Sequence, residues 1–224
     1  MILYYTHRKF GESNIIDNCF VRLAKQAERV GQKLIVVIPT QNADNIPSGL
    51  RNLKILWFDK VGTGIADIFY RIQRGLEQAT RFETVYLAEH DVLYPDEHFK
   101  HVSKRGAGYN LNYTYLSEYG YFQRHRGALS LSMLSGHANM IKEGCDFKLK
   151  ELKDNVFNSY EPKKNMIKGN FKSVEPCVDI RHDFNCSWRV DIRQDKFWNN
   201  IPNTKIWKNA DILWAEINKG DRLK

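Results

Sequence analysis

Over the first ninety residues, short apolar runs alternate with segments in which apolar residues recur at every third or fourth position. Short apolar runs, each followed by polar residues, occupy Ile2 to Thr6, Lys33 to Pro39, Leu53 to Phe58 and Thr84 to Ala88. Apolar residues spaced by three or four positions predict helices over Asn14 to Val30, which Gly31 ends, and over Gly64 to Ala79. This alternation of strand and helix predicts an α/β fold with a doubly wound sheet.

The second half of the chain has a mixed pattern. Alternating, Tyr-rich segments span Gly108 to Leu116 and Tyr119 to Gln123, and Ala128 to Leu134 leads into a predicted helix from about His137 to Phe157. The polar stretch Asn158 to Ser173 is typical of a loop. Because a single hydrophobic core commonly grows to 224 residues, we expect one domain over residues 1–224.

Composition narrows the class of protein. An apolar content of 42% is typical of a packed globular chain rather than a disordered one. No apolar run approaches the roughly 20 residues that cross a bilayer, and the apolar start is too short for a signal peptide, so we expect a cytoplasmic protein without a membrane partner. The cysteines lack CxxC or scaffold spacing, which favours reduced structural thiols at Cys19, Cys145, Cys177 and Cys186.

The charge of the chain leaves two interpretations open. Lys and Arg outnumber Asp and Glu by 34 to 26, which gives a net charge of +8 and a pI near 9.2. Such a charge attracts polyanions, so nucleic acid is a candidate partner. The basic residues are not gathered into one run, however, and an ordinary solvated basic surface explains the same numbers.

An acidic turn follows the fourth apolar run. Glu89, His90 and Asp91 come directly after Ala88, and Pro95 follows. In doubly wound sheets the ligand crevice lies beyond the carboxyl ends of the strands. Continued strand alternation places Glu89 and Asp91 on one face, where carboxylates hold Mg²⁺ or Mn²⁺ and so neutralise a departing diphosphate. An isolated E-x-D is also typical of acids that cap helices or turns.

Two further segments carry candidate chemistry. The helix that begins at Gly64 offers unpaired backbone N–H groups to a pyrophosphate, although a simple helix entry has the same sequence. The apolar segment from Val178 ends in a polar cluster with His182, whose imidazole is a good Mn²⁺ ligand, and Asp183 is placed to orient it. A surface turn explains His182 equally well.

These segments resemble a known family. Val61 to Ala79, with its Gly-Thr-Gly loop, followed by Thr84 to Asp96, with Glu89-His90-Asp91 and Pro95, is similar to the GT-A fold, family-2-like glycosyltransferases, and the likeness spans roughly residues 1–155. In that family the strand before this turn ends in a D-x-D motif; Glu89 and His90 occupy the positions of its first Asp and the residue after it. The resemblance implies a GT-A-like, Rossmann-related mixed sheet, with a nucleotide-sugar-binding half (1–105) and an acceptor half (106–224) that carries a C-terminal metal and donor segment.

The resemblance also implies roles for individual residues. Asp91 and His182 are the expected metal ligands, for Mn²⁺ or Mg²⁺ as cofactor. The expected donor contacts are Thr6, Arg8, Lys60, Gly62, Gly64, Glu89 and Arg181. His137 and Asp146 are the expected acceptor contacts. Asp91 and Glu89 are the expected catalytic carboxylates, and Asp154, beside Glu151, is a candidate general base, although residues 148–153 are also typical of an exposed charged helix face.

The resulting hypothesis is a metal-dependent transferase that moves a sugar from a nucleotide-sugar, a UDP-sugar being favoured, to an acceptor hydroxyl. A small basic transferase also resembles virus-encoded enzymes that glycosylate hydroxymethylated bases in DNA, which makes DNA a candidate acceptor. Cell-surface glycans remain an alternative, because the aromatic residues between Tyr109 and Phe122 can stack on sugars or bases. A nucleotidyltransferase and a non-catalytic nucleic-acid-binding module are further alternatives. A nucleotidyltransferase usually has a Gly- and basic-rich loop after its first strand, and Thr6 to Gly11 matches such a loop poorly.

Overall fold

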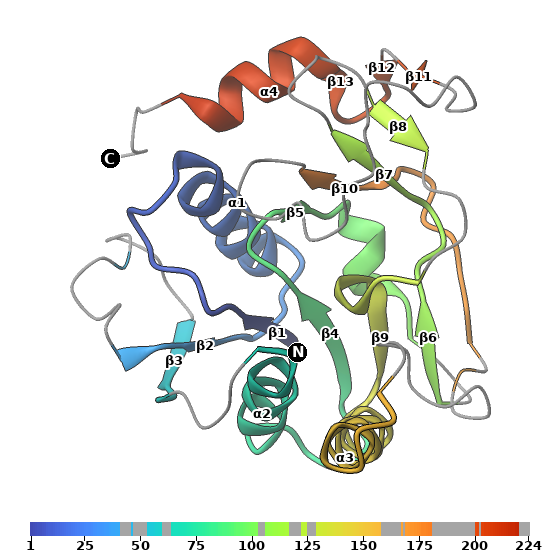
Figure 1. The fold of residues 1–224 in the computed structure, drawn as a ribbon. Helices are drawn as coiled ribbons and strands as arrows, with labels where there is room; N and C mark the ends of the chain where they lie inside the picture. The colour runs from blue at the N-terminus through green and yellow to red at the C-terminus, as the bar shows by residue number, and fades with distance from the viewer. Residues whose placement is uncertain are drawn as a thin grey trace.

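A six-stranded sheet forms the centre of the molecule in a computed structural model (Figure 1). The structure describes residues 1–40, 46, 53–59, 64–102, 106–116, 122–124, 129–157, 167, 169–180, 200–201 and 203–219. The strand order is β3 (Leu53–Trp57), β2 (Leu34–Ile38), β1 (Ile2–Tyr5), β4 (Thr84–Ala88), β9 (Leu134–His137) and β6 (Ala107–Tyr109). The first four strands are parallel, β9 is antiparallel to β4, and β6 is antiparallel to β9.

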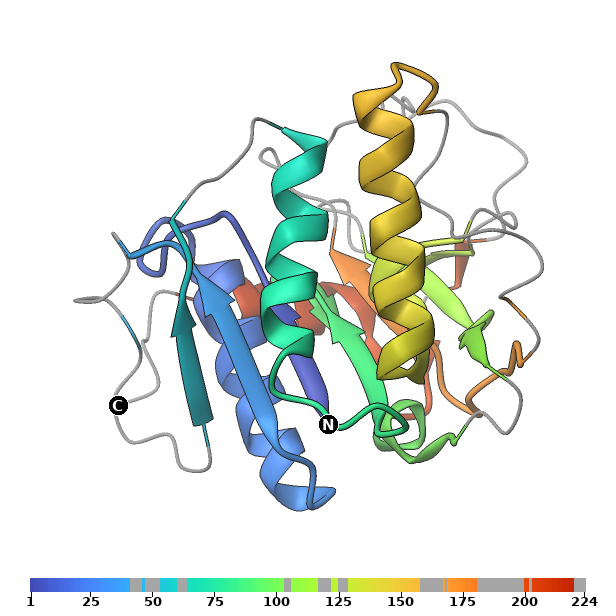
Figure 2. The same cartoon turned by 90° about the horizontal axis from the view of Figure 1, so that it is seen from below.

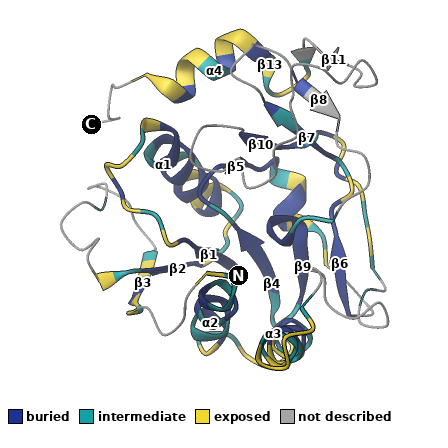
Figure 3. Cartoon of the chain, in the orientation of Figure 1, coloured by how far each residue is buried: buried dark blue, intermediate teal, exposed yellow. Residues whose placement is uncertain are grey.

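Helices cover both faces of this sheet. The helix α1 (Asn14–Arg29) lies on one face, and α2 (Ile65–Leu76) and α3 (Ala138–Lys153) lie on the other, where Figure 2 shows them side by side. Buried residues concentrate in the sheet and on the inner faces of the helices (Figure 3). The predicted α/β fold with a mixed, doubly wound sheet is therefore confirmed.

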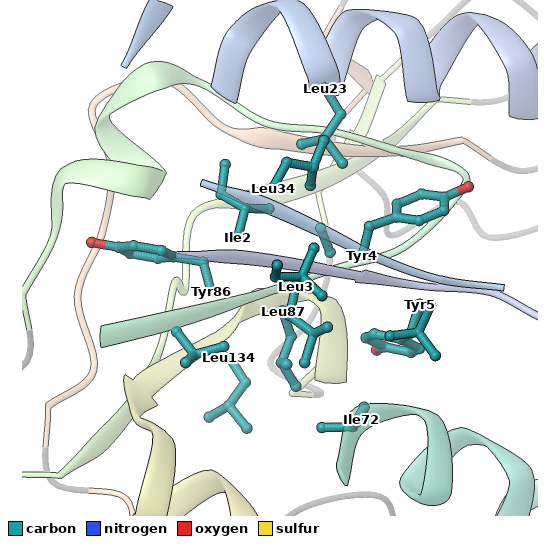
Figure 4. Close-up of a cluster of buried hydrophobic side chains, with 14 of the residues drawn as sticks. Ile2, Leu3, Tyr4, Tyr5, Leu23, Leu34, Ile72, Tyr86, Leu87 and Leu134 are labelled. Carbon is teal, nitrogen blue, oxygen red and sulfur yellow. The ribbon is translucent and has the colours of Figure 1, made fainter. Parts of the chain in front are cut away.

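Local sequence explains the central packing. All five residues of β2 are buried, as expected for a strand covered on both faces. Tyr4 points towards α1 and Tyr5 towards α2 (Figure 4), because successive side chains of a strand alternate between faces. A Cβ added to Gly75 of α2 would lie only 2.0 Å from Leu3 Cδ1, so the absence of a side chain at Gly75 lets Leu3 of β1 pack closely against α2.

A second sheet joins the first at the end of β4. Its order is β11 (Asn200–Ile201), β8 (Phe122–Arg124), β7 (Tyr113–Leu116), β10 (Cys177–Ile180) and β5 (Val92–Leu93). The short helices η2 (Asp96–Lys100) and η3 (Leu131–Met133) connect strands, and a hairpin of β12 (Asn203–Thr204) and β13 (Lys208–Asn209) precedes α4 (Ala210–Asn218). Asn18 of α1 donates a 2.6 Å hydrogen bond to the Ile217 carbonyl of α4, which fixes the C-terminal helix beside α1.

The predicted strands and helices of the first half agree with the structure to within a few residues. Within the segment predicted from Ala128 to Leu134, Leu131–Met133 form a short 3₁₀ helix, and β9 includes the start of the predicted helix at His137. Within the predicted loop, Ile167 and Phe171 form isolated bridges to the β6 region. Cys19, Cys145 and Cys177 are buried free thiols, as predicted, and Cys186 lies outside the described residues. Among the described helices, none combines the length and apolar character needed to span a membrane.

Candidate active site

The acidic turn lies where the order of the parallel strands reverses. The chain passes from β1 through α1 to β2 on one side, and from β3 through α2 to β4 on the other, so β1 and β4 are neighbours with helices on opposite faces. Their register pairs Tyr4 with Ala88, which brings the residues that follow the two strands together. In open α/β sheets this reversal point is where ligands bind.

Glu89 is held by two tyrosines. The Tyr5 hydroxyl donates a 2.5 Å hydrogen bond to Glu89 Oε1, and the Glu89 amide donates a 3.0 Å hydrogen bond to the Tyr94 hydroxyl. Both phenols are buried. Burial, and then the charge of Glu89, raise the pKa of Tyr5 well above its usual value, so this phenol stays protonated and acts as the donor. Glu89 therefore has one fixed carboxylate oxygen.

His90 contacts the residue that follows β1. Its Nδ1 lies 3.2 Å from Thr6 Oγ1, which also accepts a 3.0 Å hydrogen bond from the Arg8 amide. Among the described residues, His90 Nε2 is buried without a hydrogen bond, and it lies 3.5 Å from Asp91 Oδ2. When Nδ1 is the donor to Thr6, Nε2 presents a lone pair to a carboxylate oxygen. That arrangement suits a cation bound between the two atoms.

Asp91 is buried and connects the two sheets. It is 5% exposed, and its carbonyl accepts a 2.8 Å hydrogen bond from the Ile180 amide at the end of β10. Tyr4 and Cys19, which lie on the α1 side, have pKa values raised first by burial and then partly by the charge of Asp91. The end of β10 is therefore adjacent to the acidic turn.

The structure gives Glu89 and Asp91 different neighbours. Tyr5 donates to the Glu89 carboxylate, whereas the Asp91 carboxylate lies beside His90. The strand ends at Ala88 and the chain turns at His90 and Asp91, so the two-residue period of a strand does not continue through these positions.

A second polar group lies beside the turn. The ring of His7 lies 6.0 Å from that of His90 in an edge-on arrangement. Its surroundings lower the pKa of His7 to about 4, chiefly because they keep water from the ring and secondarily because His90 and Arg8 are close. In the first turns of α2, Arg71 donates a 2.7 Å hydrogen bond to Asp67, and both side chains are buried.

Sequence reasoning missed several members of this site, namely Tyr5, His7, Asp67, Arg71 and Tyr94. The i, i+4 spacing of Asp67 and Arg71 was a readable signal for an ion pair. Nothing in the pattern singles out Tyr5 and Tyr94, because a buried aromatic residue in a strand is most often core.

The predicted donor contacts are only partly described. Thr6 and Arg8 lie at the strand reversal, where Arg8 Nη1 also donates a 3.2 Å hydrogen bond to Glu12. Gly64 is the N-cap of α2 with a φ of 64°, a conformation that favours glycine. The remaining calls, Lys60, Gly62, Arg181 and the metal ligand His182 with its neighbour Asp183, lie outside the described residues.

The structure does not bring the predicted acceptor contacts to the turn. His137 pairs with Thr84 at the amino end of β4, about 17 Å along the strand from Glu89. Asp146 accepts hydrogen bonds from Gln73 of α2 (2.5 Å) and Lys142 (2.8 Å), so it links the outer surfaces of two helices.

The candidate base and its neighbour lie at the end of α3. Asp154 is the exposed C-cap of this helix. Glu151 accepts a 2.7 Å hydrogen bond from the buried Lys148. Among the described residues there is no group of three or more His, Cys, Asp or Glu side chains that could hold a metal ion.

Comparisons with known proteins give a likeness of fold at low identity. No family model and no curated protein matches the sequence. The structure is similar to the galactosyltransferase LgtC in complex with donor and acceptor sugar analogues, with a TM-score of 0.45, 10% identity, and coverage of 71% of this chain and 67% of that one.

Two further solved structures are similar over more of the chain. One is from Bacillus anthracis and is provisionally assigned as a glucose-1-phosphate thymidylyltransferase (TM-score 0.48, 11% identity, 99% and 97% covered). Another, from Desulfovibrio desulfuricans G20, is provisionally assigned as a nucleotide-diphospho-sugar transferase (TM-score 0.42, 11% identity, 96% and 93% covered). At these scores the likeness assigns no activity to this chain.

Proposed function

We propose that the chain is a glycosyltransferase that moves a sugar from a nucleotide-sugar, a UDP-sugar being favoured, to an acceptor hydroxyl with the help of Mn²⁺ or Mg²⁺. The observation that carries the proposal is the position of the acidic turn. Glu89 and the buried Asp91 follow β4 at the reversal of strand order, where an open α/β sheet binds its ligand.

The donor atoms at the turn fit a divalent ion in part. The Asp91 carboxylate and His90 Nε2, 3.5 Å apart and both buried, supply an oxygen and a nitrogen of the kinds that Mn²⁺ accepts. The second ring nitrogen of His90 contacts Thr6, as metal-bound histidines usually contact a neighbour. When bound, the ion would neutralise the charge of the departing diphosphate.

His182 is proposed as a third ligand. The Ile180 amide donates a hydrogen bond to the Asp91 carbonyl, and His182 follows Ile180 by two residues. Two residues of chain span at most about 7 Å between Cα atoms, so His182 cannot be far from Ile180. The same reach applies to Arg181, whose guanidinium would contact the donor phosphates. Thus the proposed metal site combines the end of β4 with the chain after β10.

Other residues of the chain would position the donor. Glu89, whose carboxylate is held by Tyr5, would contact a ribose hydroxyl of the donor. The backbone N–H groups at the start of α2, after Gly64, would face the diphosphate, and Arg8, at the end of β1, adds a positive charge. Asp154 remains the proposed general base, since it is exposed at the end of α3 and accessible to an acceptor.

DNA remains a second candidate acceptor, because a net charge of +8 attracts a polyanion. Binding of duplex DNA that weakens steeply as salt rises would support it.

The nucleotidyltransferase alternative differs in its product: transfer of a sugar releases a nucleoside diphosphate, whereas transfer of a nucleotide from a triphosphate releases pyrophosphate.

The test is release of nucleoside diphosphate from UDP- and GDP-sugars with and without Mn²⁺. We expect metal-dependent release by the natural chain and its loss in Asp91→Asn. Asp146→Asn is the matched control, because it removes an equal charge from the exposed surface between α2 and α3. Equal release by the natural chain and Asp91→Asn would reject the assignment of the site.

A further inference from the structure

A cavity of about 350 Å³ lies on the side of α1 that faces β5 and the hairpin before α4. The residues that follow the acidic turn, from Val92 to Glu97, line one side, and one face of α1 lines the other. Trp207, from the hairpin before α4, also lines the cavity. This volume is in the range of small-molecule sites, and the proposed donor site does not use it.

Hydrogen bonds between α1 and the chain after β5 hold two sides of the cavity together. Gln26 is buried, and its Nε2 donates to the Tyr94 carbonyl (2.5 Å) and to Asp96 Oδ1 (3.0 Å). Arg29 donates two hydrogen bonds to the Asp96 carboxylate, at 3.0 and 2.6 Å. The wall is therefore preorganised, which reduces the cost of ordering when a ligand binds.

An aromatic ring is fixed in the lining of the cavity. Trp207 is half-buried, and its indole Nε1 donates a 2.8 Å hydrogen bond to the Pro176 carbonyl. The Trp207 amide donates a 2.9 Å hydrogen bond to Thr204 Oγ1, which holds the backbone of the hairpin. A ring fixed at its polar edge presents its apolar surface to a ligand without losing further freedom.

The charged groups around the cavity nearly balance. Arg22, Lys25 and Arg29 line it from α1, and Asp96 and Glu97 line it from the opposite wall. Arg22 is paired with Glu216 at 2.9 Å. Among the described residues, the side chains of Lys25 and Glu97 make no hydrogen bond or ion pair, so a donor and an acceptor remain for a ligand. A polyanion is a poor match for such mixed charge.

We propose that this cavity binds an uncharged saccharide. A sugar has an apolar face of C–H groups that packs on an aromatic ring, and a rim of hydroxyls that both donate and accept hydrogen bonds. The cavity provides Trp207 for the face and Lys25 and Glu97 for the rim. Neither a nucleic acid backbone nor a purely apolar ligand would use this combination.

The saccharide is the acceptor, or a neighbouring unit of the acceptor chain, and that identification rests on the proposed function. Val92, which lines the cavity, directly follows Asp91 in the chain, so the cavity borders on the proposed metal site. Saccharide binding itself needs neither donor nor metal. It can therefore be measured independently of transferase activity.

The experiment screens the full chain, without metal or nucleotide, on an array of neutral oligosaccharides of hexoses, N-acetylhexosamines and deoxyhexoses. The dissociation constant of the best saccharide is then measured by ligand-observed NMR. We expect Trp207→Ala to weaken binding by up to about tenfold, the upper end of what an aromatic contact contributes. Lys25→Ala combined with Glu97→Gln should weaken it several-fold with an unchanged unfolding midpoint.

Glu28→Ala is the matched control, because Glu28 is exposed on α1 and does not line the cavity; its binding should equal that of the natural chain. Absence of binding to every saccharide, or equal binding by the Lys25 and Glu97 double variant, would overturn the proposal. The proposal would also be overturned if the double variant bound duplex DNA more weakly than the natural chain does but bound saccharides equally well. Saccharide binding without any response to nucleotide-sugars would reject the proposed function and leave the cavity assignment standing.

Discussion

The hydroxyl of Tyr5 donates a 2.5 Å hydrogen bond to Glu89 and so joins the ends of β1 and β4. Tyr94, which follows the turn, accepts a 3.0 Å hydrogen bond from the Glu89 amide. Two buried phenols thus fix the side chain and the backbone of one partly exposed carboxylate. A residue fixed in this way is suited to hold a ligand in one orientation.

Tyr5→Phe removes the donor to Glu89 without opening a large cavity. Because a hydrogen bond to a charged group contributes about 1.5–3 kcal/mol, we expect kcat/KM for the nucleotide-sugar to fall roughly tenfold or more. Steady-state kinetics measure this effect. Tyr86→Phe is the control, since it removes a 2.7 Å hydrogen bond from the Tyr86 hydroxyl to the His101 carbonyl, away from the turn. Equal kinetic losses in the two variants would show that the Tyr5 effect is one of stability alone.

His90→Ala should weaken the activation of turnover by Mn²⁺. The imidazole offers Nε2 beside Asp91, and its removal takes away a ligand while Thr6 keeps its hydrogen bond from Arg8. The apparent activation constant for Mn²⁺ is the measurement, with His137→Ala as control because His137 lies at the other end of β4. If the activation constant is unchanged in His90→Ala but raised in His182→Ala, the nitrogen ligand is His182, in the chain after β10, and not His90.

The ion pair of Asp67 and Arg71 should matter for stability. Asp67→Asn leaves a guanidinium buried without its carboxylate, and breaking such a pair costs about 3–5 kcal/mol of unfolding free energy. Replacing both residues, as Asp67→Leu with Arg71→Met, should restore much of the loss. Urea unfolding measures both effects. A double variant as unstable as Asp67→Asn would show that the pair supports α2 by geometry rather than by charge compensation.

Stability should fall with pH on the acid side of neutrality. Burial lowers the pKa of His98 from 6.5 to about 3. The unfolded chain therefore binds more protons than the folded chain between these two pH values. The full free energy of unfolding is present above about pH 6.5, and protonation of His98 in the unfolded chain lowers it as the pH falls. The slope approaches 1.4 kcal/mol per pH unit for one proton, at about 25 °C. Urea unfolding at pH 5, 6 and 7 tests this; an unaltered slope in His98→Gln would assign it to other groups.

The half of the fold with regular periodicity could be predicted from the sequence. The buried run of β2 and the helical spacing of α1 are local signals, and Gly31, with a φ of 68°, ends the helix as predicted. The second half was less predictable, because β10 pairs with β5 and β7 from distant parts of the chain. Such pairing depends on tertiary contacts rather than on local propensity.

The candidate site was predictable in position but not in detail. A polar turn after a buried strand identified Glu89 and Asp91, because the carboxyl ends of parallel strands share one edge. Their different neighbours depend on the turn at His90 and Asp91, which strand alternation does not predict. The partners Tyr5 and Tyr94 come from separate elements, and only the folded chain brings them together.

The most direct test of the central claim is the thermal unfolding midpoint with a panel of nucleotide-sugars, with and without Mn²⁺, for the natural chain and Asp91→Asn. A ligand that binds only the folded state raises the midpoint by mass action. We predict a Mn²⁺-dependent rise with one UDP- or GDP-sugar in the natural chain and none in Asp91→Asn. No rise with any nucleotide-sugar, or the same rise in both proteins, would contradict a donor site at the acidic turn.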